Sequence, residues 1–306
     1  MQSVTILIPT RHRPEPLARA LKCLAALDVP AGVAVDVLVV DNAREAEAAP
    51  VVEAADLPFP ARTVHEPRPG VSSARNTGVE AATGALIAFV DDDCAPGRGW
   101  LAAQLAALAE SGADASFGPR IAQLDAAGAS DDALFLDTYS RDLGAAMGAD
   151  VTADHARLPL PGAVFVKARC LAGAPFDPRL DAIGGEDVLL FRQLAEAGRR
   201  FVWAPEATMV EFIPKSRLDA RFILKRRFVS GQHRCLIPMM LDPPRRGETA
   251  QLMAKGALAV ALAGPVAAIG RLSGRWPVRA TGLLMSGLGR LTWWRRGSGL
   301  YGEGHR

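Results

Sequence analysis

Short apolar runs alternate with segments of helical periodicity along the first part of the chain. Three mostly apolar runs predict strands at residues 4–8, 35–40 and 85–90, and a short mixed run predicts another at 62–65. Segments with apolar residues at helical spacing, or rich in alanine, predict the intervening helices: residues 16–26, 45–55, 72–82 and 100–110. Strands that alternate with helices at this spacing predict an α/β fold with a mainly parallel sheet and right-handed crossovers.

The pattern is less regular over residues 119–161 and then resumes. A further strand is predicted at 163–167, and residues 184–187, with the sequence GGED, lead into a helix. The irregular stretch fits either an insertion that carries substrate selectivity or a plain surface excursion. The helix macrodipole favours acidic residues in a first turn, so a simple helix start also explains Glu186 and Asp187.

Polar residues follow each of the first four predicted strands on its carboxyl side. They are Thr10-Arg11, Asp41-Asn42, His65-Glu66 and Asp91-Asp92-Asp93. Because the carboxyl ends of parallel strands meet at one edge of a sheet, we expect these residues to converge there. This edge is where open α/β sheets bind ligands.

The last of these strands ends abruptly in three consecutive carboxylates, Asp91, Asp92 and Asp93. Like charges this close repel one another unless a cation or a set of hydrogen-bond donors offsets them. The triplet therefore indicates a metal site. A solvated acidic turn is the alternative interpretation, because most charge runs are simply exposed.

Composition and charge indicate a folded chain with two different parts. With 306 residues, of which 49% are hydrophobic and 22% charged, the chain can bury one large core and carry an appendage or a second domain. The net charge of +2 hides an uneven distribution. Residues 1–214 hold 18 basic and 29 acidic side chains, whereas residues 215–306 hold 17 and 4. We therefore predict a domain boundary after residue 214.

The sequence lacks the signature motifs of several protein classes. The four cysteines are scattered and form no CxxC pair, which argues against zinc and thioredoxin-like sites and favours a reducing compartment. No Walker sequence, GxGxxG fingerprint or GxSxG elbow follows the strands. The first strand begins directly after the first three residues without a signal peptide, so we expect a cytosolic N-terminal domain.

The basic C-terminal part, residues 215–306, is predicted to be helical and to contact a membrane surface. Its basic run at 225–227 lacks the aromatic interleaving of a nucleic-acid site, so no nucleic acid is expected. Residues 252–269 are apolar except for one lysine, contain a Gly-Pro break and have basic flanks, and a second apolar segment at 278–291 precedes two tryptophans. This pattern favours an in-plane or re-entrant hairpin on the cytoplasmic side of the cell membrane, with a true span or a packed helical subdomain as alternatives.

Five motifs in order resemble those of glycosyltransferase family 2, whose members have the GT-A fold. They are Pro9-Thr10 with Arg13, Asp41, Ala74-Arg75-Asn76-Thr77-Gly78, Asp91-Asp92-Asp93 and Gly185-Glu186-Asp187. Their order and spacing cover about residues 4–212. The resemblance implies a Rossmann-like GT-A domain at 1–214 that inverts the anomeric centre and uses a nucleotide sugar, as in polysaccharide biosynthesis.

The resemblance also implies roles for individual residues. A set of residues would bind the nucleotide sugar: Pro9, Thr10, Arg11, Arg13, Asp41, His65, Arg75, Asn76, Asp91 and Asp92. Asp93, and less clearly Asp91, would hold Mg²⁺ or Mn²⁺, while Asp187 would be the general base with Glu186 beside it. The chain departs from the family where Arg11-His12 replaces Tyr-Asn, where Asn42 replaces an Asp, and where Glu211 replaces a His near the metal.

These roles fit the chemistry of sugar transfer. A hard divalent cation offsets the charge that the nucleotide diphosphate gains as it leaves, and a carboxylate removes the proton of the acceptor hydroxyl. The expected acceptor is a carbohydrate or a lipid-linked molecule, and the basic tail favours an acceptor that is lipid-linked or delivered at the membrane. Two alternatives remain, namely a nucleotidyl- or phosphotransferase that uses a similar metal-nucleotide site, and a catalytically silent membrane-bound scaffold of the same fold.

Overall fold

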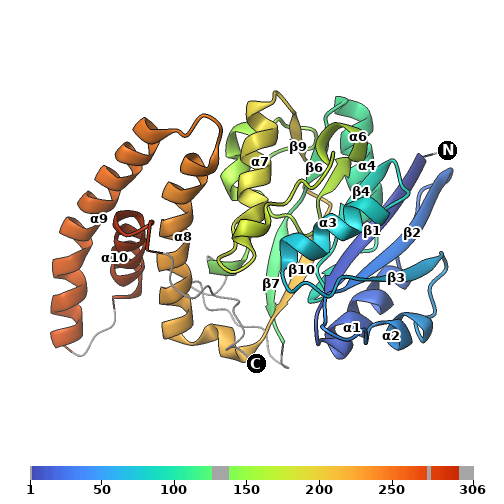
Figure 1. The fold of residues 1–306 in the computed structure, drawn as a ribbon, viewed down its shortest axis with the longest axis horizontal. Helices are drawn as coiled ribbons and strands as arrows, with labels where there is room; N and C mark the ends of the chain where they lie inside the picture. The colour runs from blue at the N-terminus through green and yellow to red at the C-terminus, as the bar shows by residue number, and fades with distance from the viewer. Residues whose placement is uncertain (1, 126–137, 274–276, 296–306) are drawn as a thin grey trace. The chain divides into compact units, whose positions relative to one another are not determined.

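The computed structural model describes residues 2–125, 138–273 and 277–295. Its first part alternates strands and helices as the periodicity predicts (Figure 1). In chain order these are β1 (Gln2–Thr10), α1 (Pro14–Ala25), β2 (Val33–Asp41), α2 (Ala49–Glu53), β3 (Ala61–His65), α3 (Val71–Ala81), β4 (Leu86–Phe89), β5 (Cys94–Pro96) and α4 (Trp100–Ser111). They are followed by β6 (Ala115–Phe117), β7 (Arg120–Leu124), a 3₁₀ helix (Thr152–Arg157), β8 (Val164–Val166), α6 (Lys167–Cys170), α7 (Glu186–Glu196), β9 (Phe201–Trp203) and β10 (Met209–Ile213).

The central sheet has seven strands in the order β3-β2-β1-β4-β8-β6-β9. The first four strands of the chain are parallel to one another, β8 runs antiparallel to β4 and β6, and β6 is parallel to β9. A second sheet has the order β5-β10-β7. The predicted α/β fold with a mainly parallel sheet is therefore confirmed.

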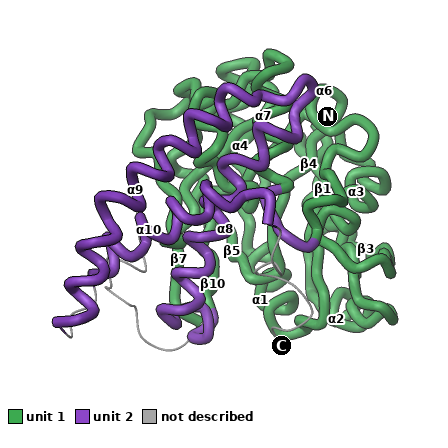
Figure 2. The backbone as a smooth tube through the Cα atoms, turned by 60° about the vertical axis from the view of Figure 1, so that its left-hand side comes forward, with its two compact units in different colours: residues 1–181, 186–213 green, residues 182–185, 214–306 purple. Residues whose placement is uncertain are grey.

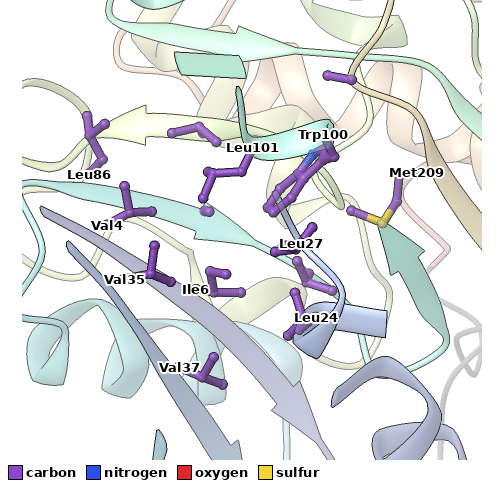
Figure 3. Packing of buried hydrophobic residues seen from close by; sticks show 14 of the residues in the cluster. Val4, Ile6, Leu24, Leu27, Val35, Val37, Leu86, Trp100, Leu101 and Met209 are labelled. Atoms are coloured by element: carbon purple, nitrogen blue, oxygen red, sulfur yellow. The ribbon is translucent and has the colours of Figure 1, made fainter. Parts of the chain in front are cut away.

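Alternate residues of β1 point to opposite faces of the central sheet. Buried apolar residues of β1 lie on both faces, and helices cover each face. Ile6 and its neighbours on that face join a buried cluster with α1 and α4, in which Trp100 is fully buried (Figure 3). The Trp100 indole donates to the carbonyl of Gly162 at 2.9 Å. Leu7 points to the other face and packs with residues of α3 and α7. A Cβ added at Gly78 of α3 would lie 2.5 Å from Leu7, so this close approach requires a glycine.

Helix α2 is shorter than the sequence predicts. We expected a helix over 45–55, but α2 covers only Ala49–Glu53. The reason is the carboxylate of Asp41, which accepts hydrogen bonds from the backbone N–H groups of Ala43, Glu47 and Ala48. These bonds hold residues 43–48 as a loop over the end of β2 and thereby delay the start of the helix.

The chain forms two compact units, coloured separately in Figure 2. Unit 1 consists of residues 1–181 and 186–213 and contains both sheets. Unit 2 consists of residues 182–185 and 214–306. Its helices are a 3₁₀ turn (Lys215–Leu218), α8 (Ala220–Met240), α9 (Arg246–Leu272) and α10 (Val278–Leu291).

The apolar segment of unit 2 differs from expectation in one respect. The break expected at Gly264-Pro265 is absent, because α9 is one helix of 27 residues that continues through Pro265. A proline within a helix removes one backbone hydrogen bond, and the turns on either side retain theirs. Within the described part of the chain, α9 is the one helix that is long and apolar enough to cross a membrane.

Candidate functional site

The polar ends of the parallel strands lie in one row at the carboxyl edge of the sheet. Thr10 of β1 is in register with Asp41 of β2, and Asp41 is in register with His65 of β3. Chain continuity from β4 brings Asp91–Asp93 next to β1, where the backbone N–H of Val90 donates to the carbonyl of Leu7. The predicted convergence of these strand ends is confirmed.

Asp92 is the most deeply buried member of the carboxylate triplet. It accepts a hydrogen bond from the Thr10 hydroxyl at 2.8 Å and one from the Arg13 guanidinium at 2.5 Å. Burial, together with the charges of Asp93 and Asp91, raises the pKa of Asp92 to about 7 against the opposing effects of Arg13 and Thr10. A carboxylate enclosed in this way positions the loop and leaves Asp91 as the more accessible carboxylate of the triplet.

The other two carboxylates of the triplet differ in accessibility. The Asp91 side chain is 31% exposed, whereas that of Asp93 is 10% exposed and lies 3.0 Å from the Arg13 guanidinium. Asp93 also fixes the second sheet, because its carbonyl accepts from the N–H of Phe212 in β10. Arg13 is half-buried and lies directly before α1, so it closes the site from the β1 side.

Arg75 connects the triplet to the predicted base. Its guanidinium lies 2.5 Å from Glu186 and 3.2 Å from Asp91, and it is buried over the ring of Phe176. Burial by itself would lower the pKa of Arg75, but the negative charges of Asp91, Glu186 and Asp187 outweigh the effect of burial, so this pKa is raised. One guanidinium thus holds carboxylates that are nearly a hundred residues apart in the sequence.

Glu186 and Asp187 form the first turn of α7, directly after two glycines with positive φ. Glu186 is buried against Arg75, whereas Asp187 is only half-buried. Burial and the charge of Asp187 raise the pKa of Glu186 to about 7, against the opposing effect of Arg75. Asp187 accepts from the N–H of Val188 at 2.8 Å. The partly exposed Asp187 is therefore the better placed of the pair to meet an acceptor.

An ion pair that the sequence reasoning missed completes the charged cluster. The guanidinium of Arg120, in β7, lies 3.1 Å from the carboxylate of Glu211 in β10, and both side chains are nearly buried. Glu211 is opposite Cys94 in the register of β10 with β5, which places it beside the triplet. The charges of Glu211 and Asp91, among others, raise the pKa of Arg120 although burial opposes this. Glu211 had stood out only as a departure from the family pattern, and no local signal singles out Arg120.

Several predicted donor-binding residues hold loops around the strand ends. Asp41 binds the backbone of residues 43–48, and His65 Nε2 lies 2.9 Å from the carbonyl of Ala43. Asn42 donates to the carbonyls of Glu66 and Arg68 and accepts from the N–H of Gly70. An aspartate at position 42 could not make the two donated bonds, which explains this departure from the family pattern.

The remaining predicted residues lie in different surroundings. Asn76 forms two hydrogen bonds with the backbone of Phe176, so its amide ties α3 to the segment before α7. Pro9 is half-buried within β1, and Arg11 is exposed after it. Direct contacts of Asn76, Pro9 and Arg11 with a nucleotide sugar therefore stay predictions.

The cluster carries an excess of negative charge that suits a hard cation. Six carboxylates face three guanidinium groups: Asp91, Asp92, Asp93, Glu186, Asp187 and Glu211 against Arg13, Arg75 and Arg120. The raised pKa values of Asp92 and Glu186 reflect this excess as well as burial. The donors are oxygens, the atoms that Mg²⁺ and Mn²⁺ prefer. Among the described residues, no three ligating side chains already converge at metal-binding geometry.

Comparison with known proteins places the chain in a family. Residues 5–139 match the family model described as glycosyl transferase family 2. The chain is 32% identical over 243 residues to the succinoglycan biosynthesis protein ExoM of Rhizobium meliloti, a match that covers 75% of this chain and 73% of that protein. It is also 32% identical to the pre-mycofactocin glycosyltransferase of Mycobacterium tuberculosis, over 67% of this chain and 42% of that protein.

Solved structures show the same fold at low sequence identity. The mannosyltransferase PcManGT of Pyrobaculum calidifontis superposes with a TM-score of 0.59 at 20% identity, over 96% of this chain and 88% of that one. Residues 1–349 of S. aureus TarS superpose with a TM-score of 0.54 at 14% identity, over 96% of this chain and 92% of that one. The extent of the match to ExoM, the family model and the shared GT-A fold together show that this chain belongs to glycosyltransferase family 2 and is an enzyme of glycosyl transfer.

Proposed function

We propose that the chain is a metal-dependent, inverting glycosyltransferase that moves a sugar from a nucleotide-diphosphate sugar to an acceptor hydroxyl. The observation that carries this proposal is the position of Arg75, which contacts both Asp91 of the triplet and Glu186 of the GED motif. Through this guanidinium the residues proposed for the donor and those proposed for the acceptor belong to one charged network in unit 1.

Asp93 and Asp91 would hold Mg²⁺ or Mn²⁺, which when bound supplies positive charge to the leaving diphosphate. The residues of the chain divide the remaining work. Asp92, held by Thr10 and Arg13, keeps the triplet loop in place. Asp187 accepts the proton of the acceptor hydroxyl, and this transfer contributes about 10²–10⁴-fold to the rate. Direct displacement by the deprotonated hydroxyl then inverts the anomeric centre.

Two printed descriptions of fold neighbours support the choice of donor class. The P. calidifontis mannosyltransferase is in complex with GDP-Man and Mn²⁺, and S. aureus TarS is in complex with UDP-GlcNAc. For this chain we therefore propose a nucleotide-diphosphate sugar without choosing its base or sugar. Thermal shifts with a panel of such donors, each with and without Mn²⁺ or Mg²⁺, identify the donor. A shift that is unchanged when the cation is removed would overturn metal dependence.

The base assignment is tested by Asp187→Asn. We expect transfer to fall by about 10²–10⁴-fold while donor binding stays near that of the unaltered protein. Asp28→Asn is the matched control, because Asp28 is exposed and precedes β2 at the amino edge of the sheet, away from the site. Full transfer by Asp187→Asn would exclude Asp187 as the base.

The reaction type is tested by its products. We expect release of nucleoside diphosphate and a product whose anomeric configuration, measured by nuclear magnetic resonance, is opposite to that of the donor. Release of pyrophosphate or phosphoryl transfer would instead identify a nucleotidyl- or phosphotransferase. Donor binding without turnover of any acceptor would identify a silent scaffold.

We further propose that residues 1–214 are the catalytic domain and residues 215–306 a membrane-associated region on the cytoplasmic side of the cell membrane. The length and apolar composition of α9 and the basic charge of this region support the assignment. It favours a carbohydrate acceptor that is lipid-linked or delivered at the membrane. In cell fractionation we expect the full chain to sediment with membranes, and its recovery in the soluble fraction at low salt would contradict this.

A further inference from the structure

Helix α9 of unit 2 exposes its largest apolar side chains. Five of them are exposed: Leu258 by 59%, Leu262 by 67%, Val266 by 53%, Ile269 by 66% and Leu272 by 89%. Their spacings of four, four, three and three residues put them on one side of the helix, over about 21 Å at 1.5 Å per residue. We call these five residues the α9 stripe.

The opposite side of α9 is built from small residues. A Cβ added at Gly256 would lie 3.1 Å from the carbonyl oxygen of Gly287 in α10, and one added at Gly287 would lie 2.7 Å from that of Gly256. Ala263 and Ala267 are buried in the same helix. Soluble proteins bury large aliphatic side chains, whereas helices in lipid pack through small residues and face the lipid with large ones. The arrangement of α9 is of the second kind.

Positive charge accompanies this inverted packing. Neither α8 nor α10 contains Asp or Glu, and α9 has none after Glu248 in its first turn. Arg234 lies on α8 and Arg290 on α10, where these two helices pack closely: a Cβ added at Gly289 of α10 would lie 3.0 Å from the backbone nitrogen of Gln232 in α8. Partial burial, followed by the charges of Arg290 and Arg227, lowers the pKa of Arg234. The guanidinium groups of Arg234 and Arg290 therefore lie close together, and the buried Nε atom of Arg290 has no hydrogen-bond partner among the described residues. An anion bound between these two groups would relieve their repulsion and supply that partner.

We propose that unit 2 binds the surface of an anionic phospholipid bilayer, with the α9 stripe among the acyl chains and Arg234 and Arg290 binding a lipid phosphate. This inference rests on the proposed membrane association and specifies its surface and its lipid class. Charge complementarity selects the occupant, because a second copy of the chain could cover the stripe but would add further arginines. Guanidinium groups bind phosphate oxygens through paired hydrogen bonds, which a zwitterionic or uncharged surface satisfies less well.

The test is flotation of the full-length chain with vesicles, without donor, acceptor or metal. Vesicles of phosphatidylcholine alone are compared with vesicles that also contain phosphatidylglycerol, and we expect binding only to the second. A double variant with Leu262→Gln and Ile269→Gln should bind at least about tenfold more weakly, because each substitution removes much of the favourable free energy of transferring an apolar side chain into the acyl chains. Circular dichroism of each variant checks that its helices form.

The arginine site is tested by a pair of variants that remove the same charge. Arg234→Gln should weaken binding by at least about tenfold, as expected for a lost hydrogen bond to a charged group. Arg279→Gln, at an exposed position in the first turn of α10, should weaken it by no more than about fivefold through general electrostatics. Arg234→Lys, which keeps the charge but loses the planar fork, should lie between the two.

Several results would overturn the proposal. The proposal fails if the chain binds both kinds of vesicle equally, or if Arg234→Gln and Arg279→Gln have equal effects. It also fails if the stripe variant, which carries both Leu262→Gln and Ile269→Gln, binds fully. A dimer in solution that the stripe variant dissociates, with no vesicle binding, would show that a second copy covers the stripe. Tight binding of inorganic phosphate without vesicles would make free phosphate the ligand. Loss of vesicle binding with intact donor turnover would leave the proposed transfer reaction standing.

Discussion

Replacing Arg75 by methionine tests the ionic connection on which the proposed site depends. Methionine keeps most of the side-chain volume but leaves Glu186 buried beside Asp187 without the cation that lies 2.5 Å away. Breaking a buried ion pair by removing one partner costs about 3–5 kcal/mol. For a unit of roughly two hundred residues this corresponds to a fall in Tm of roughly 6–20 °C. Trp100 and Trp203 are fully buried in unit 1, so their fluorescence reports its unfolding.

The loss of stability should depend on pH. The pKa of Glu186 is already raised to about 7 with Arg75 present, and removing that positive charge raises it further. In the unfolded chain a glutamate titrates near pH 4.3, so between that value and the folded pKa the folded state binds the additional proton. Stability therefore falls as pH rises through this window. The difference between Arg75→Met and the unaltered protein should be larger at pH 8 than at pH 5.5.

A second substitution provides the control. Adding Glu186→Gln to Arg75→Met removes the uncompensated charge, so the double variant should be more stable at pH 8 than Arg75→Met alone and should lose most of its pH dependence. Arg75→Lys keeps a cation and should cost less than Arg75→Met. A loss below about 1 kcal/mol at pH 8, or an equal loss at pH 5.5, would refute the pairing of Arg75 with an ionised Glu186.

Three further substitutions test the loops around the site. Asn42→Asp removes two donated hydrogen bonds, one to the buried carbonyl of Glu66 and one to the partly buried carbonyl of Arg68, so urea unfolding should show a loss of about 2–4 kcal/mol. An unchanged unfolding midpoint would contradict these bonds to the loop after β3. Hydrogen bonds from Arg68 hold the pKa of Glu66 at about 2, so its contribution is present above about pH 4.3 and is lost as pH falls toward 2. Glu66→Gln should therefore destabilise the fold by about 1 kcal/mol at pH 7 and by less at pH 3, the modest size reflecting the exposure of Arg68. Gly185→Ala should reduce kcat, because φ at this position is +91° and the new Cβ would lie 3.2 Å from the ring of His233. Gly32→Ala is the control: φ is also positive there, the added Cβ meets open space, and kcat should be unchanged.

The sequence was most informative where function depends on the ends of strands. Thr10, Asp41 and His65 could be placed in one row because parallel strands of similar length end at the same edge, and the register confirms this. The family resemblance, carried by short motifs in order, is confirmed by the comparisons. Boundaries were less accurate where a side chain competes with the helix, as Asp41 does before α2.

The division of roles within the charged residues could not be derived from local sequence. Asp91, Asp92 and Asp93 have the same side chain, yet Asp92 is enclosed by Thr10 and Arg13 while Asp91 is the most accessible. Which carboxylate is enclosed depends on residues about eighty positions away. No pattern within a few residues of the triplet carries that information.

The sequence by itself determined the alternation of the first four parallel strands with helices, the polar edge of the sheet and the excess of positive charge beyond residue 214. These properties follow from periodicity and composition, which act over a few residues at a time. Only the tertiary structure decided that Arg75 joins Asp91 to Glu186, and that α9 faces outward with leucines and inward with glycines. Burial and ion pairing depend on which distant segments pack together, and the chain must fold before those neighbours exist.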